Sequence, residues 1–260
     1  MLYKLSVLAL KSSFMKRAVQ GLRKLGARNH AIDNAVLIKK YAPGKSFADI
    51  GCMWGVDGAN SFLAEESGAT NVKAVDVYPA SERFLEEKEA RSSAVQFVLG
   101  DVNLPETIEQ LGVSDVVLCS GVLYHTPDPF RLLTRLRAIC RETLILNTQS
   151  IPEMHGIRNA AVFYPFLPEE QRRLWDRGVG TQKAIRGPYE PESGYGNWFW
   201  GMTPSAIESM LRCAGFEVDE RFVSPFGCIF VCRPVATRFV AESGPWIVPD
   251  NEDLARRRPG

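Results

Sequence analysis

The 260-residue sequence lacks a long hydrophobic run, and it has almost no net charge. Its 31 lysines and arginines nearly balance its 30 acidic residues, leaving a net charge of +1. The overall charge therefore gives no strong signal for a nucleic-acid partner. The apolar start, residues 1–10, is too short to cross a bilayer, and no small-residue cleavage site follows it. We expect no transmembrane segment and no secretory leader.

The sequence also lacks paired cysteines and has few histidines. None of its six cysteines stands in a Cys-x-x-Cys pair or in a zinc-like Cys/His spacing. Most lie in apolar runs, where a small buried thiol is the usual outcome. The absence of a disulfide pattern favours a reducing compartment, so we expect a cytoplasmic protein. With 45% hydrophobic residues, the chain can form a substantial core.

The middle of the chain alternates strand-like and helix-like segments. Such alternation predicts βαβ units and a parallel sheet. Near the end, two more strand-like segments are joined by a tight connection, which predicts a terminal antiparallel hairpin. The expected strands are 46–50, 72–77, 95–99, 114–119, 142–147, 216–223 and 227–232, and the expected helices between the parallel strands include 56–67, 82–91 and 130–140.

The chain divides into three predicted parts. Residues 1–41 form an N-terminal helical segment, whose apolar and basic residues suit packing on a domain or lying on a membrane surface. Residues 42–233 form the main domain, and 234–260 form a tail. Within the domain, 149–201 is rich in proline, glycine and aromatic residues, which is typical of a lid or binding loop. A helix resumes with Thr203 as N-cap and proline next.

Polar groups follow the expected strands at their carboxyl ends, where parallel α/β sheets bind ligands. After the first strand comes Asp49-Ile50-Gly51-Cys52-Met53-Trp54-Gly55. Its glycines allow a tight turn close to a ligand, and the next helix presents its N-terminal amides there. Asp76 ends the second strand, where an acid can accept hydrogen bonds from ribose hydroxyls. Asp101 follows the third strand, placed for an adenine amino group.

The glycine loop departs from the dinucleotide fingerprint. That fingerprint needs a middle glycine to admit a pyrophosphate, and Met53 stands there. A large side chain at this position argues against a pyrophosphate and so against a dehydrogenase. The acid Asp49, two residues before the first glycine, also suits a cationic ligand better than an anionic one.

Taken together, these motifs resemble those of class I S-adenosylmethionine-dependent methyltransferases. The resemblance covers about 42–233 and includes Gly100-Asp101 and the segment 115–125, Asp-Val-Val-Leu-Cys-Ser-Gly-Val-Leu-Tyr-His. Asp-Ile-Gly-Cys and Gly-Val-Leu-Tyr-His look like the branch that contains bacterial tRNA wobble-uridine carboxymethyltransferases and related small-molecule methyltransferases. The resemblance implies an α/β fold with a Rossmann-like, doubly wound, seven-stranded sheet, a terminal antiparallel hairpin and a lid after strand 5. Met53 and Trp54 depart from the pattern and leave the shape of the loop open.

The resemblance also implies S-adenosyl-L-methionine as the cofactor and a role for each motif. Asp49, Gly51 and Gly55 would hold its methionine part, Asp76 its ribose and Asp101 its adenine edge. Ser120 and Tyr124 would line the sulfonium side. The predicted cofactor-binding residues are Asp49, Gly51, Cys52, Gly55, Asp76, Val77, Asp101, Val102, Ser120 and Tyr124.

Methyl transfer to a hydroxyl requires alignment of the acceptor and removal of a proton. Histidine titrates near neutral pH, so the three histidines are the first candidates for the base. His30 is expected at the surface, His125 follows the fourth strand beside the sulfonium, and His155 lies just past the fifth strand on the acceptor side. We predict His155 or His125 as the base, with a carboxylate or no base as alternatives. A divalent metal stays an option that no ligand spacing requires.

Three functions remain open from the sequence. The first is a methyltransferase acting on a hydroxyl of a small molecule, a sugar or a natural product; the aromatic insertion and the near-neutral charge favour it. Its cluster at 195–200 offers aromatic faces, which stack on sugars, bases and phenols alike. The second is a tRNA-modifying (carboxy)methyltransferase, and the third is a cofactor-binding protein without catalysis. The expected partner is a small-molecule acceptor, and self-association is left open.

Overall fold

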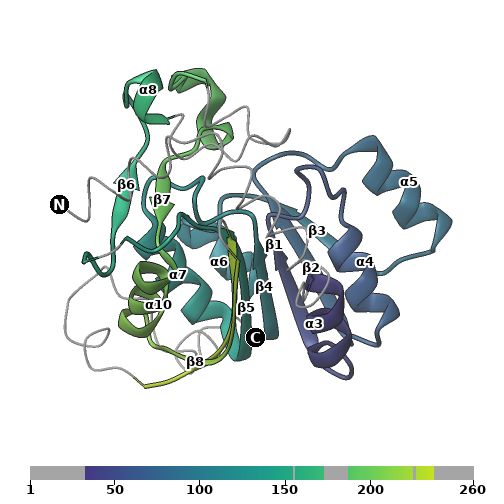
Figure 1. Cartoon of the computed structure of the whole chain (residues 1–260). Coiled ribbons are helices and arrows are strands. Elements are labelled where there is room, and N and C mark those ends of the chain that lie inside the picture. Colours follow the sequence, from purple (N-terminus) through teal and green to yellow (C-terminus); the bar gives the residue numbers. More distant parts are fainter. Residues whose placement is uncertain (1–32, 155, 173–186, 225–226, 237–260) are drawn as a thin grey trace.

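The computed structural model describes residues 33–154, 156–172, 187–224 and 227–236. These residues contain a seven-stranded sheet in the order β3-β2-β1-β4-β5-β9-β8. The first five strands in the chain pair in parallel, and β9 joins β5 and β8 in antiparallel fashion. The predicted fold class and its terminal hairpin are therefore confirmed (Figure 1). The strands are β1 (Ser46–Ile50), β2 (Asn71–Asp76), β3 (Gln96–Leu99), β4 (Ser114–Ser120), β5 (Cys140–Gln149), β8 (Phe216–Ser224) and β9 (Gly227–Pro234).

Helices cover both faces of this sheet, as a doubly wound fold requires. One face carries α3 (Asn34–Tyr41), α4 (Ala59–Glu66) and α5 (Glu82–Ala90), and the other carries α6 (Pro105–Leu111), α7 (Pro129–Ile139) and α10 (Pro204–Cys213) (Figure 1). Each face has its own hydrophobic cluster. The central strand β4 serves both, because Val117 and Cys119 point into one cluster while Val116 and Leu118 point into the other.

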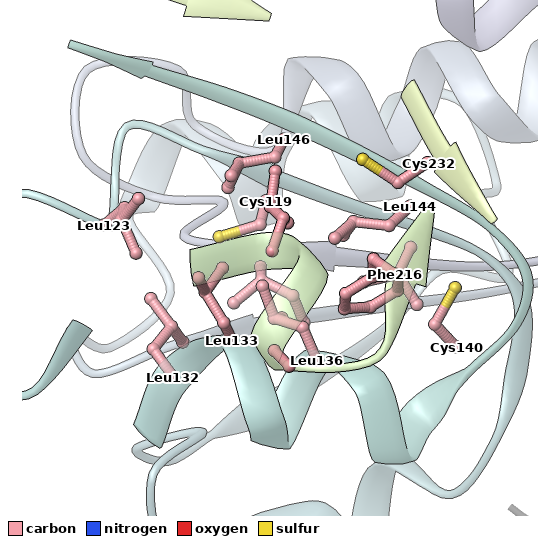
Figure 2. Packing of buried hydrophobic residues seen from close by; sticks show 14 of the residues in the cluster. Cys119, Leu123, Leu132, Leu133, Leu136, Cys140, Leu144, Leu146, Phe216 and Cys232 are labelled. Carbon is pink, nitrogen blue, oxygen red and sulfur yellow. The ribbon is translucent and has the colours of Figure 1, made fainter. Parts of the chain in front are cut away.

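The cluster under α7 shows why these segments form a helix and strands. Leu132, Leu133 and Leu136 recur at helical spacing on one side of α7 and lie in the same hydrophobic cluster as Leu144 of β5 (Figure 2). The free thiol of Cys119 lies in the same cluster (Figure 2). The cysteines at 52, 119, 140, 228 and 232 are all buried and free, and Cys213 is exposed.

Two helix boundaries differ from the sequence prediction. Helix α4 begins at Ala59 rather than at 56, because Gly55 and Gly58 take left-handed φ values of +71° and +75° and prolong the turn. Helix α6 was missed, since its seven residues span only two turns and give a weak periodic signal. The start of α10 agrees with the prediction: the Thr203 side chain accepts the N–H of Ala206, and proline follows Thr203.

The insertion after β5 contains a small sheet of its own. Strands β6 (Ala161–Phe163) and β7 (Trp200–Met202) pair in antiparallel fashion, and α8 (Glu169–Arg172) lies with them at the top of Figure 1. The insertion is fixed to the loop after β4, because the N–H groups of Phe199 and Trp200 donate to the Tyr124 carbonyl at 2.9 and 3.3 Å. A lid over the carboxyl edge of the sheet thus has a backbone anchor beside the Leu-Tyr-His segment.

The described residues include no helix long and apolar enough to cross a membrane. Of the predicted N-terminal segment, the structure describes only residues from Asp33 onward, as the N-cap and helix α3. Residues 1–32 and nearly all of the predicted tail lie outside the described part of the chain. The division into 1–41, 42–233 and 234–260 stays a prediction.

Candidate cofactor and active site

A cavity of about 450 Å³ opens at the carboxyl ends of the parallel strands and beneath the lid. It lies where the strand order reverses between β1 and β4, the usual ligand site of doubly wound folds. Its volume lies within the range of small-molecule sites. Eight of the predicted cofactor residues line it, namely Gly51, Gly55, Asp76, Val77, Asp101, Val102, Ser120 and Tyr124.

The loop after β1 is shaped by Gly51 and by a bond to β2. Gly51 has φ +82°, and a Cβ there would lie 2.3 Å from Cγ2 of Val122, so only glycine fits. The N–H of Met53 donates to Oδ2 of Asp76 at 2.8 Å. The Met53 side chain is buried in the hydrophobic core and is absent from the cavity wall, contrary to the expectation that its size would keep out a pyrophosphate. The bulky group at the cavity is Trp54, which is 66% exposed.

Asp49 and Cys52, also predicted to bind the cofactor, lie behind the cavity wall. Asp49 is 0% exposed, and its Oδ2 accepts the Ser61 hydroxyl at 2.6 Å. Its Oδ1 is buried without a hydrogen-bond partner among the described residues. Burial raises the pKa of Asp49 to about 6, and the charge of Asp76 acts in the same direction. Any role of Asp49 and Cys52 toward the cofactor stays a prediction.

Two acids stand on the cavity wall at neighbouring strand ends. Asp76 accepts the N–H of Tyr78 at 2.9 Å in addition to that of Met53. Asp101 accepts the N–H of Asn103 at 2.9 Å and the hydroxyl of Tyr195 from the lid. Burial and the hydrogen bond to Asp101 raise the pKa of Tyr195 to about 12, so its hydroxyl stays a donor at neutral pH.

Helix α3 supports Ser120 through a residue that sequence reasoning missed. The side-chain amide of Asn34 donates to Oγ of Ser120 at 3.0 Å and accepts from Nδ2 of Asn147 at 2.8 Å. The Asn34 amide thus links the side chains of Ser120, at the end of β4, and Asn147, near the end of β5, by hydrogen bonds. Asn34 lies outside every motif of the predicted site, so no sequence signal marked it.

His125 lines the cavity, and its ring is fixed in one tautomer. Its Nδ1 lies 2.8 Å from the Asn197 carbonyl oxygen. A carbonyl can only accept, so the proton is on Nδ1 and Nε2 keeps a lone pair. Burial lowers the pKa of His125, which keeps the imidazole neutral at pH 7. The ring of Trp54 is stacked near it at 6.3 Å, and Trp198 lies edge-on at 5.8 Å between centroids.

The other histidines predicted from the sequence cannot be placed in the same way. His155 and His30 lie outside the described residues, so a base at position 155 stays a prediction. Across the described part of the chain, no group of three or more His, Cys, Asp or Glu side chains is arranged to hold a metal ion. A metal site that included His155 would lie partly outside the residues searched.

The lid contributes part of the predicted aromatic cluster to the cavity. Tyr195, Gly196 and Trp198 line it, whereas Phe163 lies 4.9 Å from the ring of Trp200 on the β6–β7 sheet. Gln149 at the end of β5 also lines it, and its Oε1 is buried without a partner among the described residues. No lysine or arginine of the described chain stands on the wall.

The groups on this wall fit S-adenosylmethionine. Carboxylate oxygens carry two lone pairs each, so Asp76 and Asp101 can accept ribose hydroxyls and an adenine amino group besides their present donors. Among the described residues, only acids and neutral groups face the cavity, which suits a cationic sulfonium and offers a pyrophosphate no cation from this part of the chain. Gly51 allows the close backbone approach that such a ligand needs.

Comparison with known proteins supports the same conclusion. Residues 48–143 match the methyltransferase domain family. A tRNA U34 carboxymethyltransferase of Campylobacter hominis is 35% identical over 99 residues, which are 36% of this chain and 32% of that relative. The chain thus matches about a third of the length of that curated protein.

Solved structures resemble the chain over most of its length. The N-terminal domain of EvdMO1 with SAH bound is 20% identical, with a TM-score of 0.53, over 80% of this chain and 82% of that one. The 1,6-didemethyltoxoflavin-N1-methyltransferase of Burkholderia thailandensis is 15% identical, with a TM-score of 0.54, over 91% of each chain. Residues 48–143 are therefore similar to the methyltransferase domain family, and the chain shares its fold with these two solved proteins, a Rossmann-like methyltransferase fold.

Proposed function

We propose that the chain is an S-adenosylmethionine-dependent methyltransferase that methylates a hydroxyl of a neutral small molecule, with His125 as the general base. One observation carries the proposal: His125 stands on the wall of the same cavity as Asp76 and Asp101, neutral and with Nε2 unprotonated. A neutral imidazole with a free lone pair is the form that a proton acceptor needs.

When bound, S-adenosylmethionine would supply a methyl carbon activated by its sulfonium, and the C–S bond would break as the acceptor oxygen forms the O–CH₃ bond, with the electron pair left on sulfur. Nε2 of His125 takes the hydroxyl proton as the oxygen attacks, and the Asn197 carbonyl stabilises the resulting imidazolium. The rings of Trp54 and Trp198 stand beside His125 on the cavity wall.

The cavity wall supports a neutral, hydroxyl-bearing acceptor. A phosphate or carboxylate would meet Asp76 and Asp101 and no described cation. The aromatic rings of Trp54 and Trp198 suit the apolar face of a sugar or of a phenolic ring. Oε1 of Gln149, which has no partner among the described residues, offers an acceptor for a second hydroxyl of the same molecule. Sugars and natural-product polyols are the class that meets all three features.

A second candidate is a tRNA-modifying (carboxy)methyltransferase. The Campylobacter hominis relative, which aligns with this chain over 99 residues, favours it. Nothing on the cavity wall of the described residues resembles a phosphate site, which makes tRNA the weaker candidate. The tRNA-modifying activity belongs to a relative of which this chain matches only 32% of the length.

The decisive experiment incubates the full chain with S-adenosylmethionine and panels of sugars, phenols and unmodified tRNA, followed by mass spectrometry. The proposal predicts a small-molecule product heavier by one CH₂ and lacking one free hydroxyl. Transfer to tRNA alone would establish the second candidate. Binding of S-adenosylhomocysteine without transfer to any member would indicate a cofactor-binding protein. His125→Asn and His155→Asn, compared on the active acceptor, decide which histidine is the base.

A further inference from the structure

Residues Glu190–Asn197, the 190–197 loop, are closed on themselves by backbone hydrogen bonds and by one buried side chain. The loop contains the 3-10 segment η2 (Pro191–Gly196). The Asn197 side chain, only 7% exposed, accepts the N–H of Glu190 at 3.1 Å. It also donates to the carbonyls of Glu190 at 2.7 Å and Gly194 at 3.0 Å. One amide therefore makes three hydrogen bonds that span the whole loop.

This loop touches the cavity at two separated places. The backbone carbonyl of Asn197 accepts Nδ1–H of His125 at 2.8 Å. Two residues earlier, the hydroxyl of Tyr195 donates to Asp101. The loop thus contacts the proposed base and also the acid that follows β3.

We propose that Asn197 is a positioning residue for methyl transfer. Its side chain fixes the 190–197 loop, and the loop then holds His125 in the Nδ1–H tautomer with Nε2 free. The proposal rests on the proposed function, since it gives the histidine its role as base. The direction of a carbonyl follows from its peptide plane, so the side chain that fixes the loop also aims the acceptor at Nδ1. Without that acceptor, the imidazole proton is free to occupy Nε2 and block the base.

The same contacts join the base to the cofactor end of the cavity. Tyr195 reaches Asp101 only while the loop is closed, so the Asn197 side chain supports both contacts. A loosened loop should therefore weaken cofactor binding, and it should also allow the ring proton of His125 to leave Nδ1 for Nε2. A side chain that merely stabilised the lid would change the melting temperature and leave the tautomer of His125 unchanged.

The test records the ¹⁵N signals of the His125 ring in the full chain, which needs no acceptor substrate. Asn197→Ala removes the three side-chain bonds. Gly194→Ala strains the loop without a clash, because Gly194 has φ 48° and nothing lies within 4 Å of an added Cβ. Ser193→Ala is the matched control, since it removes one exposed bond to Glu190 in the same loop. Thermal unfolding identifies variants that remain folded.

Wild type and Ser193→Ala should show a protonated Nδ1 and an unprotonated Nε2. In Asn197→Ala and Gly194→Ala the two nitrogens should move toward averaged values, and the Kd for S-adenosylhomocysteine should rise about tenfold, the worth of one charge-assisted hydrogen bond. Folded variants with the wild-type tautomer would overturn the inference while leaving the proposed function intact. Wild-type protein that fails to bind S-adenosylhomocysteine would overturn the proposed function, and the ¹⁵N result would then decide only whether the Asn197 side chain sets the tautomer of His125.

Discussion

The hydroxyl of Tyr195 donates a hydrogen bond to the carboxylate of Asp101, joining two residues that are 94 positions apart in the sequence. Through this bond the lid contacts the acid that follows β3. Since both residues line the cavity, the lid is part of the cofactor site as well as its cover. The bond also keeps one carboxylate oxygen oriented before any ligand arrives.

Tyr195→Phe should therefore weaken the binding of S-adenosylhomocysteine. A hydrogen bond to a charged group contributes about 1.5–3 kcal/mol, so we expect the Kd to rise about tenfold or more. Calorimetry measures the change directly. Tyr189→Phe is the matched control on the lid, because the described residues offer its hydroxyl no hydrogen bond, and its Kd should match that of wild type. Equal affinities of the two variants would contradict the role of Tyr195.

His125→Asn should separate binding from catalysis. The asparagine amide can still donate to the Asn197 carbonyl, but it has no atom equivalent to the basic Nε2. We expect turnover to fall by about 100-fold or more, the usual range for a general base, with cofactor affinity changed less than about twofold. Single-turnover assays on the acceptor found in the panel measure the turnover, and calorimetry measures the cofactor affinity. Full activity in the variant would remove His125 from the mechanism.

The rate should depend on pH through the same group. Burial lowers the pKa of His125, so the base is neutral at pH 7 and becomes protonated only as the pH falls below the ordinary value of about 6.5. The kcat/KM profile should be flat near neutrality and decline on the acid side below that value. An acid limb centred above pH 6.5 would show that another group acts as the base.

Two glycines of the loop after β1 allow a matched comparison. Both Gly51 and Gly55 have left-handed φ values, but an added Cβ meets Val122 at 2.3 Å only at Gly51, whereas the space at Gly55 is open. Gly55→Ala should cost about 1 kcal/mol of backbone strain, and Gly51→Ala about 3 kcal/mol because steric overlap is added. Denaturant unfolding measures both. Adding Val122→Ala to Gly51→Ala should recover part of the difference, and no recovery would argue against the overlap.

Buried Asp49 should make the stability of the protein depend on pH. Its pKa of about 6 in the folded state lies above the unfolded value, so the folded state binds the proton more tightly. The contribution of Asp49 to the free energy of unfolding is then fully present below about pH 4. It is lost as the pH rises through about 6, and the loss is up to about 3 kcal/mol. Asp49→Asn should abolish that decrease, measured by denaturant unfolding without cofactor. A variant with the wild-type pH profile would refute the raised pKa.

Much of the fold could be predicted because its signals are local. Short apolar strands ending in polar residues, and the Thr203 cap before a proline, define elements within a few residues of one another. Helix α6 escaped because two turns give little periodicity. The side chain of Met53 was misjudged for a different reason: sequence gives its size but not its direction, and the loop turns it into the core.

The residues of the candidate site also differ in whether their roles have local sequence signals. The acids and glycines at the strand ends could be predicted, since topology brings the carboxyl ends of parallel strands together. The contacts of Asn34, Tyr195 and Asn197 could not, because each joins segments far apart in the chain. The tautomer of His125 is set by a backbone carbonyl 72 positions away, and backbone groups have no sequence signature.

The binding of S-adenosylhomocysteine to the full chain, measured by calorimetry beside Asp76→Ala, tests the central claim most directly. Asp76 also holds the glycine loop through Met53, so its loss removes bonds on both sides of the carboxylate. We predict one bound molecule per chain in wild type, no binding of NAD, and an affinity reduced about 100-fold or more in the variant. Asp219→Ala, an exposed acid paired with Arg233, should bind as wild type does. Wild-type protein that does not bind S-adenosylhomocysteine, or an Asp76 variant that binds it unchanged, would contradict the account.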